Sequence, residues 1–230
     1  MKMLLVSELI SARARFLGVL LGVVCVACPE LGATAQSAVT AIDIGKDGIG
    51  TAPAEFDSSQ GRWTLVRDTT AKAGLAVEQS GVPADEDGVP LAIYKPASIV
   101  NAEISLRLKA EGGESDRGGG LALRLSSPQD YYLAQVDALR DRVLFFRVND
   151  GAPEEIAGVD ADITSHSWHE LTVRAVDNQF TVSLDGKWVF TAFDKTFSRP
   201  GRIALWTKGD SVTRFDSITI TALSASGERF

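Results

Sequence analysis

Apolar and polar residues alternate strictly along residues 102–109, and this pattern constrains the fold of the 230-residue chain more than any other feature. Every second side chain from Ala102 to Leu108 is apolar, and the residues between them are polar. A period of two with one polar face predicts a β-strand that buries one side. The pattern recurs in shorter segments, at residues 121–125, 171–174 and 180–184.

Turn-forming residues separate these segments, at 118–120, 149–151, 177–178, 185–186 and 208–210. Asp185-Gly186 predicts a tight hairpin between residues 180–184 and 188–190. No stretch keeps a helical period, and roughly a dozen short strands with frequent turns are typical of an all-β sandwich of two antiparallel sheets. Residues 143–146 and 203–206 are apolar on both faces, so each is expected to lie centrally or to turn one face into a groove.

The first 35 residues have the three parts of a secretory signal. A basic start precedes an apolar run from Phe16 to Ala27, and small residues at Ala33 and Ala35 predict cleavage after Ala35. A lipoprotein anchored at Cys28 is the alternative. We therefore expect a periplasmic or secreted protein, in which residues 36–55 form a loosely ordered lead-in and residues 56–225 form the sandwich domain.

Composition narrows the classes of partner. Both cysteines, Cys25 and Cys28, lie in the predicted leader, so the sandwich has to be stable without disulfides. Asp and Glu outnumber Lys and Arg by 30 to 23, and no basic run is present, which argues against nucleic acid as a partner. The apolar run of the leader is too short to span a bilayer, and no second segment is long enough to do so after its removal.

A series of motifs then follows in fixed order: Gly119–Arg124, Asp130–Tyr132, Val143–Val148, Ser167–Val173, Leu184–Lys187, Pro200–Ser211 and Phe215–Ile218. Their order and spacing resemble the concanavalin A-like lectin/glucanase superfamily and, within it, the domains grouped as 3-keto-disaccharide hydrolase-like. The resemblance covers about residues 56–223. It implies a jelly-roll sandwich, an extracytoplasmic setting and a carbohydrate-related function.

The resemblance does not extend to catalytic residues. Hydrolase-type members tend to carry Gly-Glu-Trp-Asn where this chain has His166-Ser167-Trp168-His169. Glucanases of the superfamily place three acids on one strand, two of which flank the scissile bond. Here Glu114-Ser115-Asp116 supplies the first half of that pattern, but Gly119 stands where the last acid belongs, so a solvated turn is the better interpretation. The catalytic residues, if any, are therefore unknown.

Two short patterns contain residues that can bind a metal, but neither forms a complete metal site. His166 and His169 are three positions apart, so on a strand they point to opposite faces. The acidic run Asp85-Glu86-Asp87-Gly88 offers oxygens to calcium but lacks the spaced acids of a complete loop. We expect no metal and no cofactor.

Trp206 is the best candidate for a ligand contact, because it shares strand parity with charged neighbours. An aromatic ring beside hydrogen-bonding groups suits a sugar, whose C–H groups stack while its hydroxyls meet the polar groups. The candidate ligand-binding set is Trp206, Lys208 and Asp210, with Arg124, Gln135 and Asp137 from neighbouring strands. Trp63, Trp168 and Trp188 are expected to serve core or hairpin packing.

Three functions stay open. The first is saccharide binding in a shallow groove, for which Trp206→Ala should abolish glycan retention and leave the thermal midpoint nearly unchanged. The second is a hydrolase or lyase of the 3-keto-disaccharide type, and the third is a structural or partner-binding envelope protein.

Overall fold

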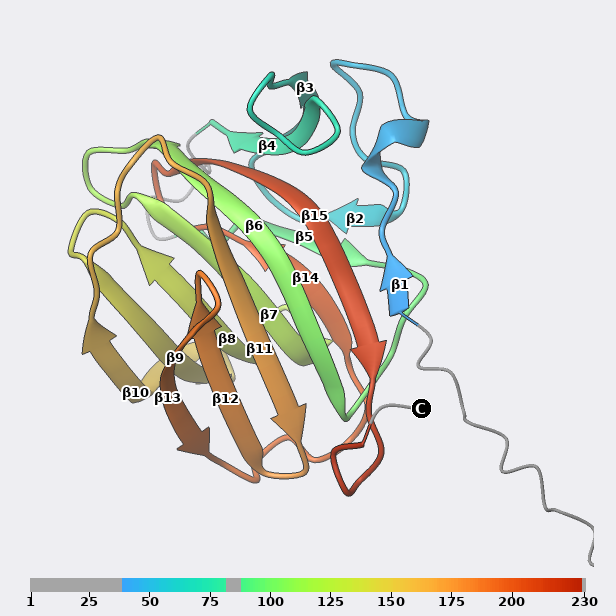
Figure 1. The fold of residues 1–230 in the computed structure, drawn as a ribbon, viewed down its shortest axis with the longest axis vertical. Coiled ribbons are helices and arrows are strands. Elements are labelled where there is room, and N and C mark those ends of the chain that lie inside the picture. Colours follow the sequence, from blue (N-terminus) through green and yellow to red (C-terminus); the bar gives the residue numbers. More distant parts are fainter. Residues whose placement is uncertain (1–38, 82–87, 229–230) are drawn as a thin grey trace, which may run out of the picture. The chain divides into compact units, whose positions relative to one another are not determined.

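The computed structural model describes residues 39–81 and 88–228, which form two antiparallel β-sheets that face each other (Figure 1). The predicted leader with Cys25 and Cys28 lies outside these residues, as do the acids Asp85 to Asp87. Within the described ranges, no helix has the length and apolar character needed to cross a membrane.

We call the larger sheet, of eight strands, sheet A. Its strands lie in the order β13 (Lys187–Phe193), β12 (Gln179–Leu184), β11 (His169–Val176), β6 (Ala102–Gly112), β15 (Val212–Ala222), β4 (Leu75–Ser80) and β3 (Arg62–Arg67), and β1 (Val39–Ala41) pairs with β15. A 3₁₀ helix, η1 (Ile44–Lys46), follows β1.

The other sheet, of seven strands, is sheet B. Its strands lie in the order β10 (Ala152–Asp160), β9 (Arg142–Asn149), β8 (Asp130–Asp137), β7 (Gly118–Ser127), β14 (Arg202–Trp206), β5 (Leu91–Tyr94) and β2 (Phe56–Ser58). Neighbours in the two sheets are often far apart in sequence, as in the pairing of β6 with β15. The predicted all-β sandwich of two antiparallel sheets is confirmed.

The alternating segments form strands as predicted. Residues 102–109 lie in β6, and the apolar side chains from Ala102 to Leu108 are at most 1% exposed. The tight hairpin between β12 and β13 turns at Asp185 and Gly186, whose φ angles are +51° and +73°. Both residues therefore adopt the left-handed conformation that Gly and Asp tolerate in such a turn.

The triple glycine at 118–120 does not form the predicted turn, because it begins strand β7. A Cβ at Gly119 would lie 2.9 Å from Cζ of Phe215, and one at Gly120 would lie 2.3 Å from the carbonyl oxygen of Ala134. Real Cβ atoms do not approach so closely, so these positions need glycine for close packing rather than for a turn.

The core between the sheets is centred on aromatic side chains. Tyr132 and Phe145 of sheet B stack with ring centroids 5.8 Å apart, and Phe180 of sheet A lies 4.6 Å from Tyr132 and 4.9 Å from Phe145. All three are fully buried. Such contacts hold the two sheets together without a disulfide.

Residues 39–55, which belong to the predicted lead-in, also pack onto the sandwich. Strand β1 pairs with β15, from Val39 opposite Thr221 to Ala41 opposite Thr219. Ile42 and Ile44 are each 7% exposed and join the core.

Candidate functional site

The side chains of β8 alternate between the core and a groove on the outer face of sheet B. Even-numbered residues from Tyr132 to Val136 belong to the core between the sheets. Odd-numbered residues from Tyr131 to Asp137 line a groove of about 540 Å³. This volume lies within the range of pockets that hold small ligands.

One row across four strands forms the middle of this groove. Trp206 on β14 lies opposite Gly120 on β7, Gly120 lies opposite Gln135 on β8, and Gln135 lies opposite Leu144 on β9. Gly120 has no side chain, and Leu133 packs beside it, with its Cδ1 3.1 Å from where a Cβ would lie. Leu144 and Phe146 also line the groove. Residues 143–146, which are apolar on both faces, therefore turn one of these faces into the groove.

Trp206 belongs to the floor of the groove rather than to an exposed plate. It is 4% exposed and packs in an apolar cluster with Leu91, Tyr131 and Leu133. Burial raises the pKa of the Tyr131 phenol, and the nearby indole N–H of Trp206 partly offsets this. The buried Nε1 of Trp206 nevertheless makes no hydrogen bond to an acceptor among the described residues.

A buried indole N–H usually finds an acceptor, since leaving one unpaired costs roughly 1–3 kcal/mol. The Nε1 of Trp206 is therefore an unsatisfied donor in the floor of the groove. Gln135 adds a second such group, because its side-chain amide makes no hydrogen bond with the described residues and lines the same groove.

Alternating charges form one wall of the groove. Arg140 donates to Oδ2 of Asp137 at 2.9 Å and to Oδ1 of Asp116 at 3.4 Å. The Nζ of Lys208 lies 3.8 Å from Oδ2 of Asp116. On the other side, Arg142 donates to Glu155 at 3.0 Å. All of these side chains line the groove.

Every acid in this groove therefore has a cationic partner. Fixed ion pairs still offer free lone pairs and N–H groups to a ligand, and the Arg fork suits two adjacent oxygens. The arrangement is suited to binding a neutral, hydroxyl-rich molecule.

The candidate residues from the sequence divide into two groups. Trp206, Lys208, Gln135 and Asp137 all line the groove. Arg124 lies elsewhere, since it is 2% exposed and donates to the carbonyl oxygens of Val100 and Phe197. Its guanidinium also lies over the ring of Phe180, 4.9 Å from the centroid, so it supports the core.

Asp210 does not line the groove, but it holds a loop beside it through hydrogen bonds. Its carboxylate accepts backbone N–H groups of Glu114 at 2.7 Å, Ser115 at 3.1 Å and Asp116 at 2.9 Å. The hydrogen bonds from Glu114 and Asp116 lower the pKa of Asp210. Asp210 therefore holds the loop that places Asp116 beside Arg140 and Lys208.

Asp210→Ala should lower the free energy of unfolding by about 1–2 kcal/mol, because it leaves three N–H groups without their acceptor. Urea denaturation at pH 7 measures the loss. Asp43→Ala is a matched control, since Asp43 accepts only the N–H of Gly45 in an exposed 3₁₀ turn, and it should cost less. Equal losses in the two variants would show that the loop does not depend on Asp210.

Residues missed from the sequence complete the groove. Arg140 and Arg142 come from the turn and the strand that follow β8, and Glu155 lies on β10. Nothing in the alternation distinguishes these charges from a solvated surface. Only the pairing of β8, β9 and β10 brings them to one side of the sheet.

Neither the acid pattern nor the histidine pair forms a catalytic or metal constellation among the described residues. Glu114 and Asp116 lie in the loop after β6, and Gly119 faces Phe215, which leaves no room for a glutamate. His166 contacts Glu111 at 2.9 Å, whereas His169 contacts Asp185 at 2.8 Å and the carbonyl oxygen of Thr164. No three His, Cys, Asp or Glu side chains converge in residues 39–81 and 88–228.

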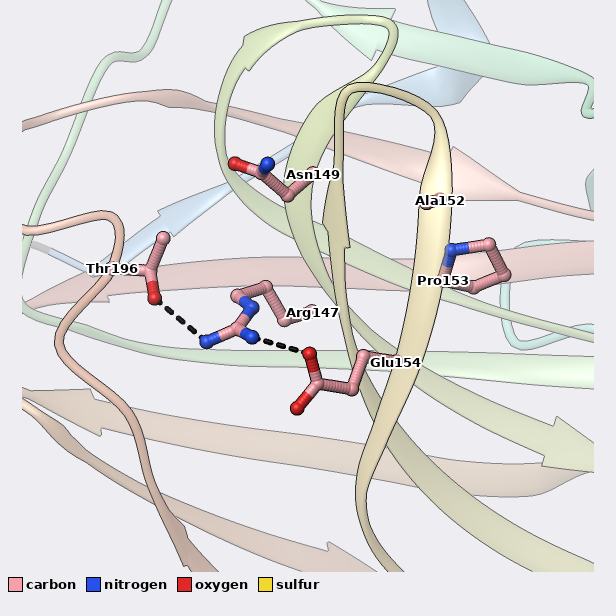
Figure 2. A pocket seen from close by; sticks show the side chains of 6 residues that line it. All are labelled: Arg147, Asn149, Ala152, Pro153, Glu154 and Thr196. Atoms are coloured by element: carbon pink, nitrogen blue, oxygen red, sulfur yellow. Dashed lines mark hydrogen bonds and ion pairs between the residues drawn. The ribbon is translucent and has the colours of Figure 1, made fainter.

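A second hollow, of about 520 Å³, lies beside the hairpin of β9 and β10. Figure 2 shows Arg147 between Thr196 and Glu154, with Asn149 and Pro153 nearby. Arg147 donates to Thr196 at 2.9 Å and bonds Glu154. It also donates to Asp194 at 2.8 Å, which in turn accepts the Tyr132 hydroxyl. These bonds tie the loop after β13 to sheet B, so Arg147 serves the structure here.

Fold and site together define a class: a concanavalin A-like jelly roll with a polar-walled groove across the outer face of one sheet. No family model matches the chain. It is 32% identical over 175 residues to the levanase of Bacillus subtilis (strain 168), a match that covers 74% of this chain and 24% of the levanase. The chain therefore spans about a quarter of the length of that relative.

Solved structures agree on the fold. The carbohydrate binding module CBM66 from Bacillus subtilis matches with a TM-score of 0.62 at 24% identity, over 73% of this chain and 96% of that one. A Bacillus subtilis protein of unknown function with a galectin-like fold matches with a TM-score of 0.53 at 8% identity, over 73% and 89% of the two chains. The predicted concanavalin A-like fold is confirmed, while the narrower likeness to 3-keto-disaccharide hydrolases stays a prediction.

Proposed function

We propose that this chain binds a saccharide in the groove on the outer face of sheet B. The observation that carries the proposal is the row Trp206–Gly120–Gln135, in which an indole N–H and an amide, both without hydrogen-bond partners among the described residues, flank a glycine. An apolar floor under polar walls suits a sugar ring, since its C–H faces pack while its hydroxyls bond.

The comparisons support this proposal and suggest the first ligand to test. CBM66 is named as a carbohydrate binding module, and the relative of 32% identity is a levanase. Levan is therefore the first candidate ligand. Export directed by residues 1–35 is part of the same proposal, because it would bring the groove to an extracellular polysaccharide.

The test compares two lysines of equal exposure. The side chains of Lys208 and Lys95 are 44% and 45% exposed, and each lies in one long ion pair, at 3.8 Å and 3.6 Å. Calorimetric titration with levan oligosaccharides, and with a panel of other neutral oligosaccharides, should show at least about tenfold weaker binding for Lys208→Ala and Gln135→Ala. That factor corresponds to about 1.4 kcal/mol of lost contact. Lys95→Ala should bind as the parent chain does.

The variants should keep their fold, because they remove side chains from a surface. Thermal midpoints within about 2 °C of the parent protein are expected. Absence of binding to every oligosaccharide by the parent chain, or equal affinity of the Lys208 and Lys95 variants, would refute the groove as a saccharide site.

A further inference from the structure

The outer face of sheet A carries a row of neutral hydroxyl side chains. Strand pairing places Ser183 opposite Trp188, Thr172 opposite Ser183, Ser105 opposite Thr172 and Thr219 opposite Ser105. The row therefore runs across five strands, from β13 to β15. We call Ser183, Thr172, Ser105 and Thr219 the hydroxyl row. All four are partly exposed, and Thr172 donates to Ser105 at 3.0 Å.

An exposed aromatic side chain stands at the end of the hydroxyl row. Trp188 is 67% exposed, contrary to the expectation that it serves packing, and Phe193 on the same strand is 61% exposed. Strand β13 forms an edge of sheet A (Figure 1). Trp188 donates from Nε1 to Oγ1 of Thr191 at 3.2 Å, which holds the indole near the strand. Large exposed apolar side chains that lie together mark interaction sites.

A shallow hollow of about 170 Å³ lies on the same face. Strand β11 contributes Arg174 and strand β12 contributes Gln179 and Thr181, and the far side is closed by Ser226 and Gly227. Thr181 lies opposite Thr191, and Gln179 lies opposite Phe193. The hollow is therefore continuous with the exposed aromatic edge.

Charge decides which partner this face suits. The hydroxyl row and Trp188 carry no charge, although 23% of the chain is charged. Arg174, in the adjacent row, lies 3.5 Å from Glu103 and bonds the carbonyl oxygen of Gly227. A charged polymer would find no unmatched opposite charge among these side chains. Hydroxyl groups and an aromatic face instead match a neutral, hydroxyl-rich chain.

We propose that the outer face of sheet A, from Trp188 along the hydroxyl row, is a second contact surface for a neutral polysaccharide. It lies on the opposite side of the sandwich from the groove, so the two surfaces act on separate stretches of polymer. Two linked contacts raise retention on a polymer without changing the affinity of the groove for a short ligand. The surface shares no residue with the groove, so a variant of one can be tested without altering the other.

The experiment separates polymer retention from binding of short ligands. Depletion assays use insoluble or high-molecular-weight levan, inulin, xylan, starch and cellulose, and titration uses short oligosaccharides of the same sugars. Trp188→Ala should reduce retention on at least one polymer by about fivefold, the factor that about 1 kcal/mol of aromatic contact represents. Its affinity for short ligands should not change, and neither should its thermal midpoint.

The test has one control variant and two outcomes that would contradict the proposal. Ile49→Ala removes an apolar side chain that is 53% exposed outside sheet A, and it should leave retention unchanged. Unaltered retention of Trp188→Ala on all five polymers would overturn the proposal. So would a parent chain that sedimentation shows to be a dimer and that becomes monomeric in Trp188→Ala, because β13 would then be an interface between copies. Loss of short-ligand binding in Lys208→Ala tests only the groove. It does not affect the interpretation of polymer retention by Trp188→Ala.

Discussion

Trp206→Ala is expected to lower the free energy of unfolding by about 3–5 kcal/mol, the cost of truncating a buried Trp. Trp206 is 4% exposed and packs with Leu91, Tyr131 and Leu133, so its removal opens a cavity on the outer face of sheet B. Urea denaturation followed by circular dichroism measures the loss. The same change should abolish saccharide binding in the groove.

This expectation replaces the one drawn from the sequence, that the thermal midpoint would hardly move. Trp206→Phe separates the two roles, because it keeps most of the packing and removes only the indole N–H. It should cost less than about 1.5 kcal/mol of stability. Saccharide affinity should nevertheless fall by at least about tenfold if a ligand oxygen accepts that N–H. Parent-like affinity in Trp206→Phe would mean that Nε1 does not contact the ligand.

Lys109→Met should lower the free energy of unfolding by about 3 kcal/mol, the lower end of the cost of breaking a buried ion pair. Lys109 and Asp68 have side chains 7% and 3% exposed, and Nζ of Lys109 lies 2.5 Å from Asp68. Arg214 still donates to Asp68 at 3.0 Å, which keeps the loss from being larger. Lys46→Met is the control, because its pair with Glu55 is exposed and screened by solvent, so its loss should be much smaller.

The loss in Lys109→Met should shrink as the solution is acidified. Burial raises the pKa of Asp68, but hydrogen bonds from Lys109 and Thr70 outweigh it and hold that pKa well below its usual range. A depressed folded-state pKa contributes stability above the unfolded value, near 3.9, and loses it as pH falls through the folded value. Without Lys109, Asp68 protonates more readily and escapes the cost of a buried charge. Denaturation at pH 7 and pH 3.5 tests this, and an equal loss at both values would contradict the role assigned to Asp68.

The strands could be predicted because their signal is local. Alternation in residues 102–109 depends only on which residues adjoin in sequence, and β6 extends over Ala102–Gly112. The hairpin at Asp185-Gly186 is equally local. The predicted turn at residues 118–120 was wrong, because the glycines there allow Phe215 and Ala134 to pack closely against a strand. Those two residues come from β15 and β8, which no local pattern reveals.

The site could be predicted only in part for the same reason. Trp206, Gln135, Asp137 and Lys208 do line one groove, because strand parity follows from the sequence. Arg124 has a φ of +50° and turns into the structure, which parity did not anticipate. The exposure of Trp206 and Trp188 was expected the wrong way round, since burial depends on what neighbouring strands place beside a ring.

By itself, the sequence determined that this chain forms an all-β sandwich stable without disulfides in its described part, because alternation and turn residues act over a few positions. The tertiary structure alone decided which outer face became a groove and which a flat hydroxyl-bearing surface. That decision rests on register: β14, β7, β8 and β9 align Trp206, Gly120, Gln135 and Leu144 although they are distant in sequence. Cross-strand alignment brings together side chains that the sequence keeps apart, and the chemistry of a binding site depends on that alignment.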